Sequence, residues 1–379
     1  MKIALLVNMI APARIPVYSG LASRFELLVL HGGTESNRDS WRDMEKALPD
    51  AQVIKAWGWQ INIPRRQNGK VFDRRYIHIT PGFLYHLLRY KPDAVISNEM
   101  GFRTLTALLY GTIFRKPVFV WWGGTTHTER GIGLIKRSLR ALLSRWARRW
   151  ISYGQTSTEY LRTLGIPRER IVQIQNAVDE QRFTANVRPA FTLQTKPVVL
   201  YVGQFIARKG VEFLLAAAAV LQREGLVFSL LLIGNGRDKL QMEKRAKDLH
   251  LNNVHFHAAL PPDKMPAVYR SGDVLVFPTL EDPWGLVANE AILCAVTVLC
   301  SRYAGCAQEL FPAENIFDPE NIAEFTEKLR SAVQGQLLAP EPARLKSTPQ
   351  IVNALVEALE KSVPQSRREE EKEPLTHTA

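Results

Sequence analysis

Short apolar segments alternate with helical segments along most of the chain, and this alternation restricts the possible folds more than any other feature. It predicts an α/β protein in which parallel strands are wrapped by helices. In the first half, strands are expected at residues 3–8, 26–30, 53–56, 94–97, 118–122, 149–153 and 171–174. A second set is expected at residues 197–203, 227–233, 254–257, 274–277 and 297–300. Two separate sheets are therefore predicted.

The domain limits follow from this pattern. A chain of 379 residues is too long for one hydrophobic core and fits two domains of ordinary size. We predict an N-terminal domain over 1–180, a linker over 181–196 and a C-terminal domain over 197–348. A helix over 349–362 follows, with packing back on the N-terminal domain as one option. The tail, 363–379, has almost no apolar residues and should be disordered.

The cysteines and the apolar segments bear on compartment. Cys294, Cys300 and Cys306 are spaced six residues apart with no histidine-rich motif nearby, so neither a zinc site nor a disulfide framework is indicated. No run of eighteen apolar residues exists, and residues 1–8 are too short for the core of a signal peptide. A cytoplasmic location is predicted, with a peripheral position on the inner face of the membrane as a further option.

The positive charge is concentrated in the first half. Residues 1–180 hold 27 Lys and Arg against 14 Asp and Glu, whereas the remainder holds 22 against 23. Such an excess suits an anionic partner. Nucleic acid is the weaker choice, because no recognised binding motif accompanies the charge.

Residues 134–150 predict a basic amphipathic helix. Its apolar residues at helical spacing are Leu139, Leu142, Leu143, Trp146 and Trp150, and its cations are Lys136, Arg137, Arg140, Arg145, Arg148 and Arg149. A helix that lies in a membrane interface has this pattern. A helix that packs on the core and carries a cationic outer surface has it too, so both interpretations stay open.

The segment 273–295 combines a strand, an acidic loop and a helix start. The apolar run 274–277 predicts a buried strand, Pro283 and Gly285 interrupt the chain, and a helix is expected from Leu286. A helix start offers unpaired N–H groups and a positive dipole end, which suit a phosphate. Asp282 precedes this start and Glu290 lies about one turn inside the helix. Two ordinary acids near a helix start are the alternative.

Two further loops join this candidate site. Arg208 and Lys209 follow the strand at 197–203, where they could neutralise a diphosphate, and Gly203 permits close approach to the backbone. His127 lies in the loop after the strand at 118–122 and could bind a sugar hydroxyl. A solvated basic loop and a structural histidine are the alternatives. Because ligands bind beyond the carboxyl ends of parallel strands, residues 8–16, 98–101 and 122–130 are expected at the same crevice.

These motifs, in this order, resemble those of the family 4 glycosyltransferases of GT-B fold. The matching segments are Val202-Gly203, Arg208-Lys209-Gly210, Gly234-Asn235-Gly236, Asp282 to Glu290, and Asn176 to Asp179. The resemblance implies two Rossmann-like domains that face each other across a cleft. It also implies a retaining hexosyltransferase that moves a sugar from a UDP- or GDP-sugar to a glycan or lipid-linked acceptor, in cell-surface polysaccharide or glycolipid synthesis.

The resemblance assigns roles to single residues. Glu290 matches the second acid of the E-x7-E motif, which holds the ribose hydroxyls, and Asp282 stands where the first acid contacts the transferred sugar. Arg208 and Lys209 match the cations that stabilise the departing diphosphate, and His127 matches a histidine that meets the sugar across the cleft. The remaining donor-binding positions are Gly203, Gln204, Gly234, Asn235, Gly285, Leu286 and Val287. The family generally needs no metal ion, and no Asp-x-Asp motif appears here; no other cofactor is expected.

The sequence departs from the family pattern at several positions. Asp282 is shorter than the usual glutamate, and Gln204 replaces an arginine that many relatives carry. Ala295 and Thr297 stand in place of a glycine and a proline. Two alternatives therefore remain: another GT-B enzyme, such as a nucleotide-sugar 2-epimerase, or a non-catalytic protein that binds nucleotide sugars.

Overall fold

The computed structural model describes residues 1–33, 44–67 and 70–363. The first sheet has seven parallel strands in the order β3-β2-β1-β6-β7-β8-β9. Its strands are β1 (Lys2–Val7), β2 (Glu26–His31), β3 (Gln52–Lys55), β6 (Ala94–Asn98), β7 (Val118–Trp122), β8 (Arg149–Ser152) and β9 (Ile171–Gln173). The associated helices are α1 (Ile15–Ala22), α2 (Gly82–Tyr90), α3 (Phe102–Ile113), α4 (Leu134–Trp146) and α5 (Gln155–Thr163).

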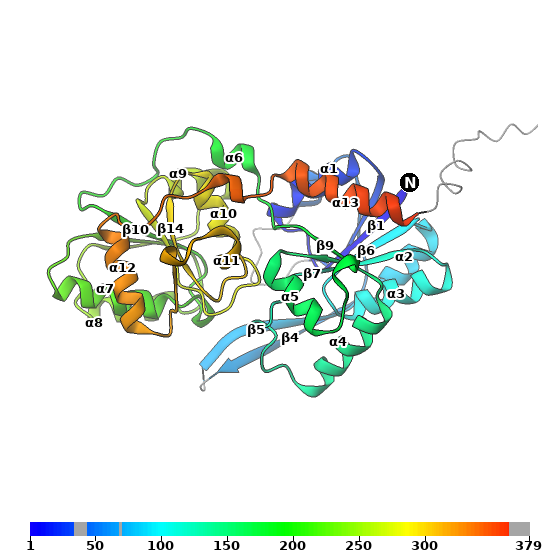
Figure 1. Cartoon of the computed structure of the whole chain (residues 1–379), viewed down its shortest axis with the longest axis horizontal. Coiled ribbons are helices and arrows are strands. Elements are labelled where there is room, and N and C mark those ends of the chain that lie inside the picture. The colour runs from blue at the N-terminus through cyan, green and yellow to red at the C-terminus, as the bar shows by residue number, and fades with distance from the viewer. Residues whose placement is uncertain (34–43, 68–69, 364–379) are drawn as a thin grey trace, which may run out of the picture.

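The second sheet has six parallel strands in the order β12-β11-β10-β13-β14-β15. Its strands are β10 (Val198–Val202), β11 (Ser229–Ile233), β12 (Val254–His257), β13 (Val274–Phe277), β14 (Thr297–Ser301) and β15 (Ile316–Phe317). The helices of this half are α6 (Glu180–Thr184), α7 (Val211–Arg223), α8 (Lys239–Asp248), α9 (Met265–Tyr269), α10 (Leu286–Leu293), α11 (Ala307–Leu310) and α12 (Ile322–Val333). The two sheets form two lobes (Figure 1). The predicted α/β fold with two parallel sheets is confirmed.

Both faces of each sheet are buried, which explains the continuous apolar runs in the sequence. Along β1, Ile3, Leu5 and Val7 enter the core on one face, while Ala4 and Leu6 enter the core on the other. Strand β10 divides its residues between two cores in the same way. In each sheet the strand that comes first in the chain lies inside the sheet, β1 between β2 and β6 and β10 between β11 and β13. The order in which the chain adds strands reverses at these two strands, so ligand crevices are expected at their carboxyl ends.

The last helix, α13 (Thr348–Ser362), returns to the first lobe and packs along α1 (Figure 1). Ile351, Leu355 and Leu359 join the core of the N-terminal sheet. Gly20 of α1 allows this approach, because a Cβ there would stand 2.6 Å from a methyl carbon of Val352. The start of α13 has a capping box formed by Ser347 and Gln350. The predicted disorder of 363–379 concerns residues that, from 364 on, lie outside the described ranges.

Two sequence expectations need correction. The basic helix ends at Trp146, and residues 149–150 belong to β8. Trp150 is fully buried in the core, so burial in the sheet prevailed over helical spacing. No element was expected between residues 57 and 82, where β4 (Trp59–Gln67) and β5 (Lys70–Ile79) form an antiparallel hairpin. Pro64 lies within this segment, and proline disfavours a strand because it has no N–H to donate. A two-stranded ribbon tolerates it, because each strand has an open edge.

Candidate functional site

The two predicted basic residues and the first predicted acid meet at the carboxyl edge of the C-terminal sheet. The loop after β10 carries a 3₁₀ turn, η5 (Ala207–Lys209), and the loop after the neighbouring β13 carries Asp282. Lys209 Nζ lies 2.6 Å from Asp282 Oδ2. Arg208 NH1 donates to the carbonyl oxygen of Glu281 at 2.7 Å and lies 4.0 Å from Asp282 Oδ2. Adjacent parallel strands thus bring together residues about 73 positions apart.

Two glycines make this close approach possible. Gly210 has φ 69°, and a Cβ there would stand 2.0 Å from the carbonyl oxygen of Pro278. Gly285 has φ 103°, and a Cβ there would stand 2.4 Å from the ring of Phe277. Any other residue would be strained and would push the two loops apart. The sequence pattern of glycines at these positions therefore has a direct steric cause.

The Lys209–Asp282 pair is largely buried, with 14% and 15% of the side chains exposed. Burial raises the pKa of Asp282, but the charges of Lys209 and Arg208 outweigh it and hold that pKa below its ordinary value. Burial also lowers the pKa of Lys209, against the opposing effect of Asp282. Asp282 Oδ1 further accepts a hydrogen bond from the backbone N–H of Trp284 at 3.1 Å. Asp282 is therefore ionised at neutral pH and fixed in place.

Helix α10 begins directly after this loop. Gly285 caps it, and the first N–H groups, those of Leu286 and Val287 among them, lack partners within the helix. Glu290 lies one turn farther on and accepts a hydrogen bond from the hydroxyl of Tyr269 on α9. Burial raises the pKa of Glu290 to about 7. Protonated and ionised forms of this carboxyl therefore coexist at neutral pH.

His127 reaches the donor-side loops from the N-terminal sheet. Its Nε2 lies 2.8 Å from the carbonyl oxygen of Leu280, so Nε2 carries the proton and donates. Nδ1 then accepts from Arg130 NH1 at 3.1 Å, and the ring stacks on Tyr303 with centroids 4.1 Å apart. Burial lowers the pKa of His127, which favours this neutral ring. The sequence analysis missed Tyr303, which carried no motif.

The other predicted donor positions lie at the ends of β10 and β11. Gly203 donates its N–H to Ile233, and Gly234 donates its N–H to His257, so the carboxyl ends of three neighbouring strands are tied together. The carbonyl of Gln204 accepts from the hydroxyl of Tyr201 at 2.8 Å. Asn235 Oδ1 accepts from the N–H of Ala259 at 3.3 Å. These loops therefore form one continuous rim beside η5.

Ala295 shows what one departure from the family pattern costs. It has φ 58°, in the left-handed region where glycine is unstrained. A side chain there costs about 1–2 kcal/mol. The structure thus explains why glycine suits this position at the end of α10. The backbone strain is at Ala295 and not at Arg208 or Lys209.

The hairpin β4–β5 contributes two residues that the sequence analysis did not predict. Arg65 NH1 lies 2.7 and 2.8 Å from the two carboxylate oxygens of Glu281. Asp73 Oδ2 lies 2.7 Å from Arg208 Nε. The alternation of Trp59, Ile61 and Ile63 is a strand signal, and the Asn-Gly dipeptide at 68–69 is a hairpin-turn signal in the sequence. Neither signal tells which part of the chain the hairpin contacts.

The loops of the N-terminal sheet that were expected at the crevice also carry polar groups. The guanidinium of Arg14 lies 4.5 Å from the ring centroids of both Trp121 and Tyr153. The hydroxyl of Tyr153 donates to Asn98 Oδ1 at 3.3 Å. Within the described ranges, Asn8 Oδ1 and Trp121 Nε1 are buried and have no hydrogen-bond partner. This edge therefore holds buried polar groups that have no partner within the described residues.

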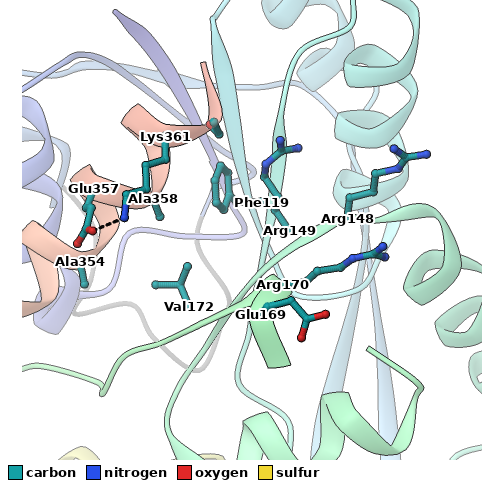
Figure 2. Close-up of a pocket in the computed structure, with 11 residues that line it drawn as sticks. Phe119, Arg148, Arg149, Glu169, Arg170, Val172, Ala354, Glu357, Ala358 and Lys361 are labelled. Atoms are coloured by element: carbon teal, nitrogen blue, oxygen red, sulfur yellow. Dashed lines mark hydrogen bonds and ion pairs between the residues drawn. The ribbon is translucent and has the colours of Figure 1, made fainter. Parts of the chain in front are cut away.

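A second region of interest lies at the opposite, amino edge of the N-terminal sheet. Two grooves of about 590 and 720 Å³ open there, beside the last turns of α13. Figure 2 shows the first groove, with Arg148, Arg149 and Arg170 on one side and Lys361, paired with Glu357, on the other. Over residues 1–33, 44–67 and 70–363, no carboxylate oxygen lies within 4.0 Å of the nitrogens of these three arginines. Burial and the neighbouring Arg148 lower the pKa of Arg149.

Comparisons with known proteins match part of the chain to glycosyltransferases. Residues 184–348 match the model of a family described as "Glycosyl transferases group 1". The 2-deoxystreptamine glucosyltransferase of Streptomyces kanamyceticus is 30% identical over 216 residues, which cover 51% of this chain and 56% of that protein. The GDP-mannose-dependent alpha-(1-6)-phosphatidylinositol monomannoside mannosyltransferase of Mycolicibacterium smegmatis is 27% identical over 153 residues, covering 37% and 40%. The matches thus span about half of these relatives.

Solved structures resemble the chain over nearly its full length. The apo lipopolysaccharide outer core galactosyltransferase WaaB has a TM-score of 0.69 at 16% identity, covering 95% of this chain and 99% of that one. Anabaena HepE in complex with UDP and glucose has a TM-score of 0.65 at 15% identity, covering 98% and 100%. At this identity the likeness concerns the fold, which is the GT-B arrangement of two parallel-sheet lobes.

Proposed function

We propose that the chain is a retaining glycosyltransferase of family 4, which moves a hexosyl group from a nucleoside diphosphate sugar to an acceptor hydroxyl. The observation that carries the proposal is the gathering of Arg208, Lys209 and Asp282 at the start of α10. This cluster lies inside the segment that matches the group 1 family. Cations and unpaired N–H groups at a helix start stabilise a departing diphosphate.

The reaction exchanges one bond at the anomeric carbon for another. The bond to the diphosphate oxygen breaks, and a bond to the acceptor oxygen forms on the same face. The acceptor proton passes to the departing diphosphate. Arg208, Lys209 and the N–H groups at the start of α10 stabilise the charge that develops on the diphosphate. Asp282 holds the sugar, and Glu290 holds the ribose hydroxyls. Both ring nitrogens of His127 have partners, Leu280 and Arg130, so His127 binds the sugar only by giving up one of them. We propose that no metal ion takes part.

The acceptor is proposed to be a glycan or a lipid-linked molecule, met at an anionic membrane surface. Leu134, Ile135 and Leu142 on α4 are 78%, 89% and 53% exposed, and the arginines of the amino-edge groove supply positive charge. Trp150 does not contribute, because it is buried. Arg140 does not contribute either, because its Nε lies 2.6 Å from Glu129 inside the lobe. No helix of the described residues is long and apolar enough to cross a membrane.

Thermal unfolding with UDP, GDP and their sugars tests the donor part. A ligand at 100 times its Kd adds about 2.7 kcal/mol to the free energy of unfolding. We expect one nucleotide series to raise the melting temperature. Donor consumption with and without a sugar acceptor then separates three activities. A transferase needs the acceptor, a 2-epimerase converts the donor alone, and a non-catalytic protein binds without turnover. Repeating the assay with a chelator tests the independence from metal.

A further inference from the structure

The β4–β5 hairpin extends from the N-terminal lobe to the other lobe and contacts the loops that hold the predicted diphosphate cations (Figure 1). Arg65 pairs with both carboxylate oxygens of Glu281, and Asp73 pairs with Arg208. Between these two residues, the carbonyl of Val71 accepts a hydrogen bond from Arg237, and Phe72 is only 5% exposed. The end of the hairpin is therefore docked on the C-terminal lobe, against the loops that carry Arg208 and Glu281.

Both predicted diphosphate cations have carboxylate partners. Lys209 pairs with Asp282 at 2.6 Å, and Arg208 pairs with Asp73 at 2.7 Å. A diphosphate that reached these cations would stand beside two carboxylates, and like charges at such distances repel strongly when they are partly buried. Exchange of one of the two carboxylates for the diphosphate would relieve this repulsion.

The two carboxylates differ in how firmly they are held. Asp282 is fixed by the N–H of Trp284, by a β-bridge to Ala304 and by burial within its own lobe. Asp73 is 26% exposed and belongs to a ribbon of only two strands. The pair of Asp73 with Arg208 is thus the more exposed to water of the two, and an ion pair in contact with water costs less to break. Asp73 is therefore the carboxylate that moves at the lower cost in free energy.

We infer that the hairpin is a further part of the donor site, in which Asp73 occupies Arg208 until the diphosphate of the donor displaces it. The inference rests on the proposed function and adds to it a competing group from the other lobe. Donor binding would then break a contact between the two lobes. The ligand concerned is the nucleoside diphosphate portion, whatever the sugar.

Calorimetric titration of Asp73→Asn with UDP and GDP tests the inference. The variant keeps the shape of the side chain but removes its charge, so Arg208 becomes available. We expect the Kd of the nucleotide that the natural protein binds to fall by about three- to fivefold, the range for loss of a partly exposed ion pair. A Kd that rises would show that Asp73 positions Arg208 for phosphate and would overturn the inference. An unchanged Kd would overturn it as well.

Arg65→Gln provides an independent variant, because it loosens the hairpin while leaving Asp73 and Arg208 in place. We expect it to lower the same Kd, whereas the matched control Arg66→Gln, an exposed neighbour, leaves it unchanged. Hydrogen exchange gives a direct readout. Nucleotide should speed exchange in residues 59–67 and 71–79, and slower exchange there would contradict displacement.

The failure of this inference is distinguishable from failure of the proposed function. If the natural protein binds neither UDP, GDP nor their sugars, the proposed function fails. If the natural protein binds one of them and the Asp73 and Arg65 variants bind no more tightly, only the role of the hairpin fails.

Discussion

Two clusters of basic side chains differ in almost every physical respect. Arg208 and Lys209 in the cleft are 15% and 14% exposed, and each lies opposite a carboxylate. Arg148, Arg149 and Arg170 in the amino-edge groove have no carboxylate within 4.0 Å in the described part of the chain. A buried cation needs a partner, whereas a cation in contact with water does not. Pairing with a carboxylate therefore distinguishes the cations of a preorganised site from the cations of an open surface.

The difference predicts two kinds of behaviour. Fixed and buried charges act at short range, so a single substitution in the cleft should have a large effect that salt changes little. Hydrated charges in the groove act together at long range, so single substitutions there should have small effects that salt abolishes.

Lys209→Ala should cause the largest change. Its charge is needed most as the diphosphate leaves, so kcat should fall about 10²- to 10³-fold with a smaller change in KM. Because Asp282 then loses its partner in a buried site, unfolding should also become easier by about 3–5 kcal/mol, and kinetics must be measured well below the melting temperature. Steady-state kinetics decide the matter, with the exposed Lys264→Ala as control. A normal kcat with a raised KM would reduce Lys209 to an anchor of the bound donor.

Glu290→Ala should come next. The ribose would lose a charge-assisted hydrogen bond, worth about 1.5–3 kcal/mol or roughly 10- to 150-fold in Kd. Calorimetry with the nucleotide measures this loss, and circular dichroism checks that the variant is folded. Unchanged affinity in a folded variant would remove Glu290 from the donor site and leave only its hydrogen bond with Tyr269.

The sequence predicted the residues of the site around Arg208 and Asp282 better than those of the amino-edge groove, because the former follow strands of a single sheet. Arg208, Lys209, Asp282 and Glu290 lie in loops and a helix start directly after strands of one sheet, and parallel strands bring such loops to one edge. Local patterns therefore sufficed to predict that these residues meet. The strands of the two parallel sheets, except β15, could also be read from their apolar runs, within a few residues.

Contacts between distant segments could not be read in this way. Arg65 and Glu281 are 216 positions apart, and only the docking of one lobe on the other brings them together. Trp150 has helical spacing with Trp146, yet it lies in β8 because the sheet offered a fully buried position. The groove forms where α13 returns across the ends of β7 to β9, which no local pattern encodes.

The double variant Arg148→Gln/Arg149→Gln tests the groove. Each cation near an anionic bilayer contributes about 1 kcal/mol, so binding to phosphatidylserine vesicles should fall by about 30-fold at low salt. Raising the salt to 0.5 M should release the natural protein as well, because the charges are screened over a few ångströms. Co-sedimentation measures both, with the ion-paired Lys361→Gln as control. If the natural protein does not sediment with the vesicles at low salt, the groove does not bind membranes, and an anionic glycan acceptor becomes its proposed ligand.

The smallest expected effect is the pH dependence that Glu290 confers, and it has opposite signs for stability and for binding. Burial raises the pKa of Glu290 from 4.5 to about 7, so between these values the folded protein holds a proton that the unfolded chain has lost. The contribution of Glu290 to the free energy of unfolding is therefore full below pH 4.5 and is lost as the pH rises through about 7.

Donor binding should change the other way. If the ribose hydroxyls donate to the ionised carboxylate, the Kd should fall about fivefold between pH 6 and pH 8, less than the full change in ionised fraction because a neutral carboxyl still accepts hydrogen bonds. Glu290→Gln has no proton to lose and should flatten both profiles, while the Asp282 pair, ionised throughout this range, should contribute to neither. A pH profile for nucleotide binding that persists unchanged in Glu290→Gln would place the titrating group elsewhere in the cleft.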